Sequence, residues 1–168
     1  ADKVASLTTV ATPHYGTVLA DLILRTPEII TEKLSDIVDW FGNSVYPREK
    51  SEVLSSVEQL CRNYIQEEFN PSTPNLEDFP YFSYSAAVGK GTDFSINPVF
   101  MFQNVQIFAQ EDINDSFVSV KSAQWGKHLG TVPLSHMNQI NVQVSKENKP
   151  KYKDFWIGVV KMLRDRGF

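Results

Sequence analysis

The sequence predicts an α/β fold, and three observations carry the prediction. Two apolar runs, residues 4–11 and 81–86, are rich in β-branched or aromatic residues and are typical of buried strands. Between them, apolar residues recur at helical spacing over most of residues 17–70. A further helical stripe occupies residues 152–163. This order of strand, helices, strand, loop and helix is typical of an α/β protein, here with a thin sheet of two or three strands.

The first half of the chain is expected to hold one strand and three helices. The strand over residues 4–11 runs into a loop at Thr12-Pro13. Apolar residues spaced by three and four then predict the helices. The helices are expected after Gly16, from Thr26-Pro27 and after Pro47, and the third is expected to end before Asn70-Pro71.

The second half opens with a turn region between Pro71 and Pro80, after which residues 81–86 form the second strand. Residues 99–109 are apolar and aromatic but alternate poorly, which leaves open a strand or an extended cover over a pocket.

The remaining elements are a short helix, a loop and a long helix. Residues 119–126 are expected to form the short helix and residues 129–141 the loop. The long helix carries one apolar stripe, made of Tyr152, Phe155, Trp156, Val159, Val160 and Leu163. Charge and cap signals follow it at Arg164, Arg166 and Gly167.

Composition excludes several classes of protein. The 168 residues are 42% hydrophobic and 12% aromatic, which suits a sizeable core and argues against disorder. The 16 Lys and Arg stand against 20 Asp and Glu, without the basic cluster of a nucleic-acid-binding protein. With Cys61 as the one cysteine, we expect neither an intrachain disulfide nor a cysteine metal cluster. Neither a signal peptide at Ala1-Asp2-Lys3 nor a transmembrane stretch is indicated.

An acidic loop and a later histidine are the main candidates for chemistry. The loop runs from Glu111 to Ser116 and contains Asp115, and His136 lies on a later loop. A carboxylate and a histidine that follow neighbouring strands can make the imidazole a general base in acyl transfer. On spacing alone, a surface acid and an unrelated loop histidine are the favoured interpretation, and a catalytic pair is the alternative.

Four other groups favour structural roles. His14 fits the closing of a strand-to-helix turn at least as well as catalysis, and His128 fits a solvated side chain. Gly89-Lys90-Gly91 lacks the rest of a phosphate loop and is expected to be a turn. Cys61 lies on an apolar helix stripe, as a core thiol does.

Two further kinds of site lack the pattern they need. Asp112, Asp115 and Asn138 offer oxygen ligands for calcium, but no loop has the ligand density of a dedicated site. No Gly-x-Ser-x-Gly occurs, so the strand-to-helix turn that exposes an activated serine is missing from the sequence.

Four blocks follow one another over nearly the whole chain. They are SLTTVATPHYG at 6–16 with Ala20-Asp21 after it, YIQEEFNPSTPN at 64–75 with YFSY at 81–84, NDSFVSVKSAQWG at 114–126, and LGT at 129–131 with SHMNQIN at 135–141. In this order they resemble the C-terminal half of triacylglycerol lipases of the α/β-hydrolase superfamily. The fungal mitochondrial type is the closer resemblance, and bacterial family I lipases are the more distant one.

The resemblance implies that residues 1–168 are the C-terminal half of an α/β-hydrolase fold: its last parallel strands, lid helices and C-terminal helix. It implies Asp115 as the triad acid, His136 as the general base and residues 21–47 as a lid over an acyl-chain pocket. The N-terminal half, with the oxyanion loop and the serine, is absent from the sequence. We therefore expect a complementary segment or partner chain to supply the serine, this chain alone to be inactive, and no cofactor to be needed.

Three positions depart from the family pattern. The family usually has arginine where Tyr15 stands, glycine where Ser116 stands and aspartate where Asn138 stands. That aspartate ligates calcium in the bacterial enzymes, and the neutral Asn138 is a weaker ligand, so we expect no metal site.

These departures keep three functions open. The first is a hydrolase of triacylglycerol or other acyl esters, completed by the missing half and in contact with a lipid surface. The second is a non-catalytic lipase-like subunit of a larger assembly. The third is a module that binds acyl chains without chemistry. The resemblance is also the one indication of a compartment, the mitochondrion.

Overall fold

The computed structural model describes residues 3–25, 55–142 and 149–168. The chain divides into two compact units, one made of Ala1–His14 with Asn75–Phe168 and the other of Tyr15–Pro74. The helix expected from Thr26-Pro27 and most of the lid expected over residues 21–47 lie outside the described residues.

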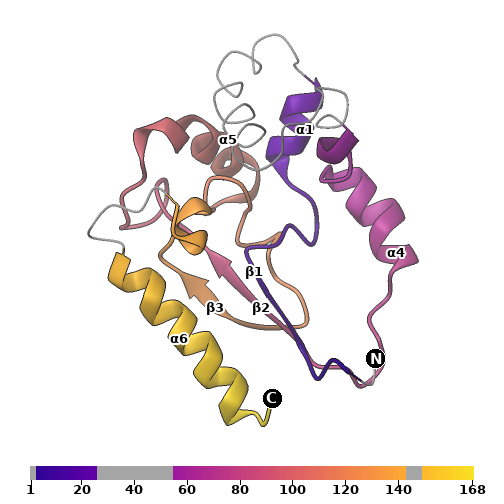
Figure 1. The fold of residues 1–168 in the computed structure, drawn as a ribbon. Coiled ribbons are helices and arrows are strands. Elements are labelled where there is room, and N and C mark those ends of the chain that lie inside the picture. The colour runs from indigo at the N-terminus through magenta and orange to yellow at the C-terminus, as the bar shows by residue number, and fades with distance from the viewer. Residues whose placement is uncertain (1–2, 26–54, 143–148) are drawn as a thin grey trace. The chain divides into compact units, whose positions relative to one another are not determined.

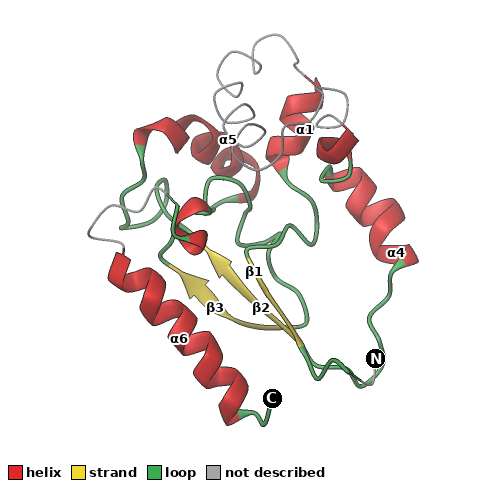
Figure 2. Ribbon diagram, in the orientation of Figure 1, coloured by secondary structure: helices red, strands yellow, loops and turns green. Residues whose placement is uncertain are grey.

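The first unit is built on a parallel sheet of three strands (Figures 1 and 2). The strands are β1 (Leu7–Val10), β2 (Tyr81–Ala86) and β3 (Lys127–Val132), in the order β1-β2-β3. The central strand β2 buries four of its six side chains, whereas β1 and β3 each pair on one side within the described residues. The predictions of a strand within residues 4–11 and a strand over residues 81–86 are confirmed.

The strand β3 and the turn before it correct two predictions. Residues 127–132 are a strand and not part of a loop, and residues 119–123 form a turn and not a helix, closed by the bond from Ala123 N to Ser119 O. The sequence does not indicate β3, because this edge strand is half-exposed and carries polar residues such as Lys127 and His128, so it lacks the apolar run of a buried strand. The short helix η3 (Met137–Ile140) lies within the rest of the expected loop, and residues 133–136 before it have neither helix nor strand.

Residues 99–109, which the sequence left open as a strand or an extended cover over a pocket, are helical. They belong to η2 (Pro98–Phe100) and α5 (Met101–Glu111). The helical pattern is obscured because α5 buries Gln103 and Asn104 beside Ile107, while several of its apolar side chains are exposed. Buried amides in place of aliphatic residues remove the apolar stripe by which an amphipathic helix is recognised.

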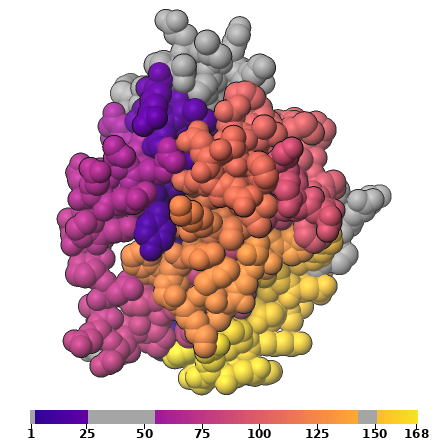
Figure 3. Space-filling view, turned by 180° about the vertical axis from the view of Figure 1, so that it is seen from behind, coloured from indigo at the N-terminus to yellow at the C-terminus, as the bar shows by residue number. Residues whose placement is uncertain are grey.

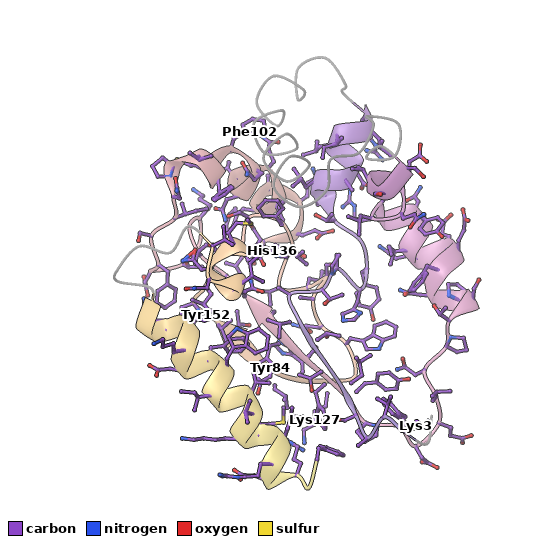
Figure 4. All side chains as sticks on the ribbon, viewed as in Figure 1. Lys3, Tyr84, Phe102, Lys127, His136 and Tyr152 are labelled. Carbon is purple, nitrogen blue, oxygen red and sulfur yellow. The ribbon has the colours of Figure 1, made fainter. Side chains whose placement is uncertain are left out.

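The last helix, α6 (Lys149–Asp165), confirms the prediction for the C-terminal stripe. Tyr84 of β2 meets Phe155 edge to face with ring centroids 5.4 Å apart, and Figure 4 shows Tyr84 beside the helix. The stripe is not wholly buried, since Val160 is 64% exposed. Gly167, at φ 85°, closes the helix with bonds from Gly167 N to Arg164 O and from Phe168 N to Leu163 O.

The second unit contains α1 (Val18–Arg25), the π-helix η1 (Tyr64–Phe69) and α4 (Asn70–Ser72). The helix after Gly16 is thus confirmed. The third expected helix does not end before Asn70-Pro71, because Pro71 lies in the first turn of α4, where its missing N–H costs no bond. Among the described residues, no helix has the length and apolarity that crossing a membrane requires.

Candidate active site

Asp115 and His136 meet beyond the carboxyl ends of β2 and β3. His136 comes four residues after β3, at the start of η3, and Figure 4 shows it near those strand ends. The bond from His136 N to Asp115 O, 3.0 Å, ties the two loops together. The loops that follow parallel strands meet at one edge of the sheet, where α/β proteins place their sites.

The side chains of the two residues are hydrogen-bonded. Nδ1 of His136 lies 2.8 Å from Oδ2 of Asp115. A carboxylate accepts hydrogen bonds, so Nδ1 is the donor and Nε2 keeps its lone pair in the neutral ring. The side chain of Asp115 is fully buried, whereas that of His136 is 29% exposed. The arrangement pairs a buried, oriented carboxylate with an imidazole that solvent or substrate can reach.

The carboxylate of Asp115 receives four hydrogen bonds. Oδ1 accepts from the backbone amides of Phe117 and Val118, at 3.0 and 2.8 Å. Oδ2 accepts from the imidazole and from the side-chain amide of Gln139, at 2.9 Å. Donors of this kind stabilise a buried charge, which otherwise costs much free energy away from water.

An aromatic ring and the charge of Asp115 set the environment of His136. Phe117 stacks on the imidazole with ring centroids 5.1 Å apart, and Phe100 packs edge to face on Phe117. Burial favours the neutral imidazole, but the charge and hydrogen bond of Asp115 outweigh it and raise the pKa of His136 above its usual value.

The residue after Asp115 is strained. Ser116 has φ 87°, its side chain is buried, and its hydroxyl has no hydrogen-bond partner among the described residues. A left-handed φ suits glycine, which is what the resembling family usually has here. Ser116 therefore adopts a backbone conformation that glycine would adopt without strain.

The other two histidines have structural partners. Nε2 of His14 lies 2.9 Å from Oγ1 of Thr9, and the ring stacks on Trp125 at 5.0 Å. Burial lowers the pKa of His14 to about 4. His128 is half-buried, with Nε2 2.9 Å from Oγ of Ser85, so the prediction of a solvated side chain is wrong.

Cys61 and the turn Gly89-Lys90-Gly91 have environments that favour structural roles. Cys61 is half-buried, and burial is the largest cause that raises its pKa to about 11, so the thiolate that a nucleophile needs is disfavoured. Gly89 and Gly91 have φ 75° and 81°, as expected of a turn.

The three oxygen donors considered for calcium have other roles in the described structure. Both Asp115 oxygens accept hydrogen bonds, Asn138 Oδ1 accepts one from the Ser135 hydroxyl, and Asp112 follows the last turn of α5 at φ 73°.

Sequence reasoning missed two residues around the pair, Gln139 and Trp156. Gln139 donates to Asp115, and Trp156 of α6 donates its indole N–H to the backbone oxygen of Gln139 at 2.9 Å. A spacing of three residues from His136 places Gln139 on the same side of a 3₁₀ turn, but the sequence indicated a loop there.

Comparison with known proteins finds lipases among the proteins that this chain is similar to. No family model matches the chain. Over 156 residues the chain is 30% identical to triacylglycerol lipase 2 of Saccharomyces cerevisiae, an alignment that covers 91% of this chain and 40% of that protein. The chain therefore spans about two-fifths of the length of this curated relative.

Solved structures share the fold. Staphylococcus hyicus lipase matches with a TM-score of 0.68 and 17% identity, over 95% of this chain and 56% of that one. Bacillus licheniformis lipase BlEst2 in its mature form matches with a TM-score of 0.55 and 23% identity, over 79% and 48%. The parallel sheet with its helices and these likenesses together show that the chain has an α/β fold and covers part of the fold of these lipases.

Proposed function

We propose that this chain supplies the acid and base of a serine hydrolase that acts on acyl esters. The observation that supports the proposal most directly is the 2.8 Å bond between His136 Nδ1 and the buried Asp115 Oδ2. The likeness to a yeast protein named triacylglycerol lipase adds a substrate class, an acyl ester of glycerol.

In this mechanism His136 is the general base and Asp115 orients it. Asp115 holds Nδ1–H, so Nε2 accepts the proton of the serine hydroxyl as the serine oxygen attacks the ester carbonyl. His136 then gives that proton to the departing alcohol and leaves an acyl-enzyme. Water, deprotonated by the same histidine, attacks the acyl carbonyl; the bond to the serine oxygen breaks, the carboxylic acid leaves, and the histidine returns the proton to the serine oxygen. The charge of Asp115 stabilises the imidazolium that forms in each half-reaction.

The serine belongs to a segment outside these 168 residues. The sequence lacks Gly-x-Ser-x-Gly, and the chain spans 40% of its yeast relative, so most of the relative has no counterpart in it. Within the described residues no strand pairs with the outer edge of β1, so this edge can accept a further strand, which that segment or a partner chain would supply. On this proposal the chain alone has no turnover.

A lipid surface is the proposed setting, with residues 21–47 as the lid. Around η2 and the start of α5, four apolar side chains are exposed: Val99, Met101, Phe102 and Val105. Exposed apolar side chains gathered on one segment are typical of lipid or protein contact. The double substitution Val99→Glu and Val105→Glu should lower activity on emulsified triacylglycerol and spare activity on a soluble short-chain ester. Equal loss on both substrates would contradict the lipid contact.

Substitution of His136 in the complete gene product tests the catalytic proposal. His136→Ala should reduce kcat for a p-nitrophenyl acyl ester by at least about a thousandfold. His128→Ala is the matched control, because His128 bonds to Ser85 and lies outside the proposed mechanism. A folded His136→Ala protein with unchanged turnover would remove His136 from the reaction. Fractionation of cells tests the mitochondrial location that the resemblance suggests.

A non-catalytic lipase-like subunit is the second candidate. The departures at Tyr15, Ser116 and Asn138 favour it, and Ser116 shows the strain of a substituted glycine position. The hydrogen bond between His136 and Asp115 argues against this candidate, because a site without a catalytic role would not need to keep it. Asp115→Asn separates the candidates: a catalytic protein loses its esterase activity, and a structural subunit has none to lose.

A further inference from the structure

The Asp115 carboxylate oxygen that faces His136 is shared with a second side chain. Nε2 of Gln139 lies 2.9 Å from Oδ2, and Nδ1 of His136 lies 2.8 Å from the same atom. Gln139 is 4% exposed and Asp115 0%, so bulk water has no access through which to replace the amide donor. Oδ2 is held between an imidazole and an amide.

We propose that Gln139 is a positioning residue for the reaction, which fixes the Asp115 carboxylate toward His136 and moderates the negative charge that the imidazole meets. The inference rests on the proposed function, since orientation of the imidazole affects turnover only where His136 is the base. Gln139 acts through Asp115 and is not itself a catalytic residue.

The conformation of η3 explains how His136 and Gln139, three residues apart, both donate to the same oxygen of Asp115. His136 is the N-cap of η3 and Gln139 is the third residue of that helix. Side chains three residues apart in a 3₁₀ helix are eclipsed, so both leave the turn on the same side and reach one carboxylate.

A second element fixes that turn. Trp156 of α6 donates its indole N–H to the backbone oxygen of Gln139 at 2.9 Å. In Figure 3 the surface of α6 (yellow) adjoins that of residues 125–142 (orange). The C-terminal helix thereby anchors the residue that orients the acid.

An uncharged amide suits this position on electrostatic grounds. A cation there would neutralise the carboxylate, and an anion would repel it. The amide donates a hydrogen bond and leaves the full negative charge in place, while it draws part of that charge toward itself. Asp115 is the charged group that acts on His136, so loss of the amide should direct more of its charge at the imidazole.

Two substitutions of similar size test the proposal in the complete gene product. Gln139→Met removes the donor, and Gln139→Glu replaces it with a second carboxyl group. The pKa of His136, followed by NMR of the labelled histidine rings, should rise by about half a pH unit or more in Gln139→Met, and the acid limb of kcat/KM for an acyl ester should move to higher pH with it. In Gln139→Glu the buried carboxyl group beside the Asp115 carboxylate keeps its proton and donates in place of the amide, so both quantities should stay closer to their wild-type values.

Gln103→Met is the matched control. Gln103 is a second buried glutamine, but in the part of the chain that the structure describes its amide nitrogen has no hydrogen-bond partner, so its loss should leave the titration of His136 unchanged. A histidine pKa that stays put in folded Gln139→Met would overturn the inference. If Gln139→Met unfolds, Trp156→Phe decides in its place, because it frees the Gln139 backbone and should raise the same pKa by a smaller amount.

The two proposals fail separately. A wild-type protein without esterase activity contradicts the proposed function, while the histidine titration still reports on the electrostatic role of Gln139. Esterase activity with an unmoved histidine pKa in Gln139→Met contradicts this inference alone.

Discussion

Asn104 and Asn114 pair through their side chains below the loop that carries Asp115. Nδ2 of Asn104 donates to Oδ1 of Asn114 at 2.8 Å, and Nδ2 of Asn114 donates back to the backbone oxygen of Asn104 at 3.0 Å. Both residues are at most 1% exposed. Since Asn114 directly precedes the acid, the pair connects α5 to the position of the Asp115 carboxylate.

Asn104→Ala should lower the free energy of unfolding by about 2–4 kcal/mol, because it leaves several buried groups without partners. The amide of Lys90, the carbonyl of Val88 and the side chain of Asn114 all bond to this residue. Chemical denaturation measures the loss. Asn75→Ala is the control, since it removes an exposed amide and should cost less. Equal losses of unfolding free energy in the two variants would show that the buried Asn104–Asn114 pair stabilises the protein no more than an exposed amide does.

Ser116→Gly should stabilise the protein by about 1–2 kcal/mol. Serine at φ 87° is strained, its buried hydroxyl has no partner within residues 3–25, 55–142 and 149–168, and glycine relieves both costs. Ser119→Gly is the opposite control, because the Ser119 hydroxyl donates to Glu111 at 2.6 Å and accepts from the backbone of Ser122. Thermal unfolding should therefore move to higher temperature in the first variant and lower in the second. A loss of stability in Ser116→Gly would remove the strain argument.

The fold could be predicted where burial and local pattern agree. The sequence locates β2 with its true bounds because its aromatic and small residues fill both faces of a central strand. It locates α6 because an apolar stripe and a glycine cap coincide. It misses α5, whose buried face includes Gln103 and Asn104, and β3, whose outer edge is polar. In both cases tertiary contacts decide what the local pattern leaves ambiguous.

The candidate site could be predicted as residue types but not as a network. Asp115 and His136 stand out through the block resemblance, and the structure brings them together. Gln139 could not be identified, because its role depends on a 3₁₀ turn and on contact with α6. A hydrogen bond between side chains on separate elements leaves no periodic signal in a sequence.

His14 should make the protein less stable as the pH falls from about 6.5 to about 4. Burial lowers its pKa to about 4, so the unfolded chain takes up a proton in this range that the folded chain does not. The free energy of unfolding then falls by up to about 1.4 kcal/mol per pH unit. His14→Phe keeps a ring against Trp125 and cannot ionise, so its stability should depend less on pH. Parallel pH profiles of the two proteins would contradict this.

The raised pKa of His136 gives the proposed reaction its acid limit. Activity needs the neutral imidazole, so kcat/KM should fall as the pH falls through this pKa. The stability that the charged pair contributes has the opposite dependence. It is fully present below pH 6.5, the ordinary histidine pKa, and is lost as the pH rises through the raised value.

Asp115→Asn should reverse the direction of the His136 shift. Burial lowers the pKa of this imidazole and only Asp115 raises it, so removal of the charge leaves burial to act alone. The His136 titration should therefore move below 6.5, while turnover falls because the imidazolium loses its counter-charge. NMR of the three histidines in this chain measures the shift, with His14 and His128 as internal references. A His136 pKa that stays above 6.5 would mean that a group other than Asp115 holds the proton there.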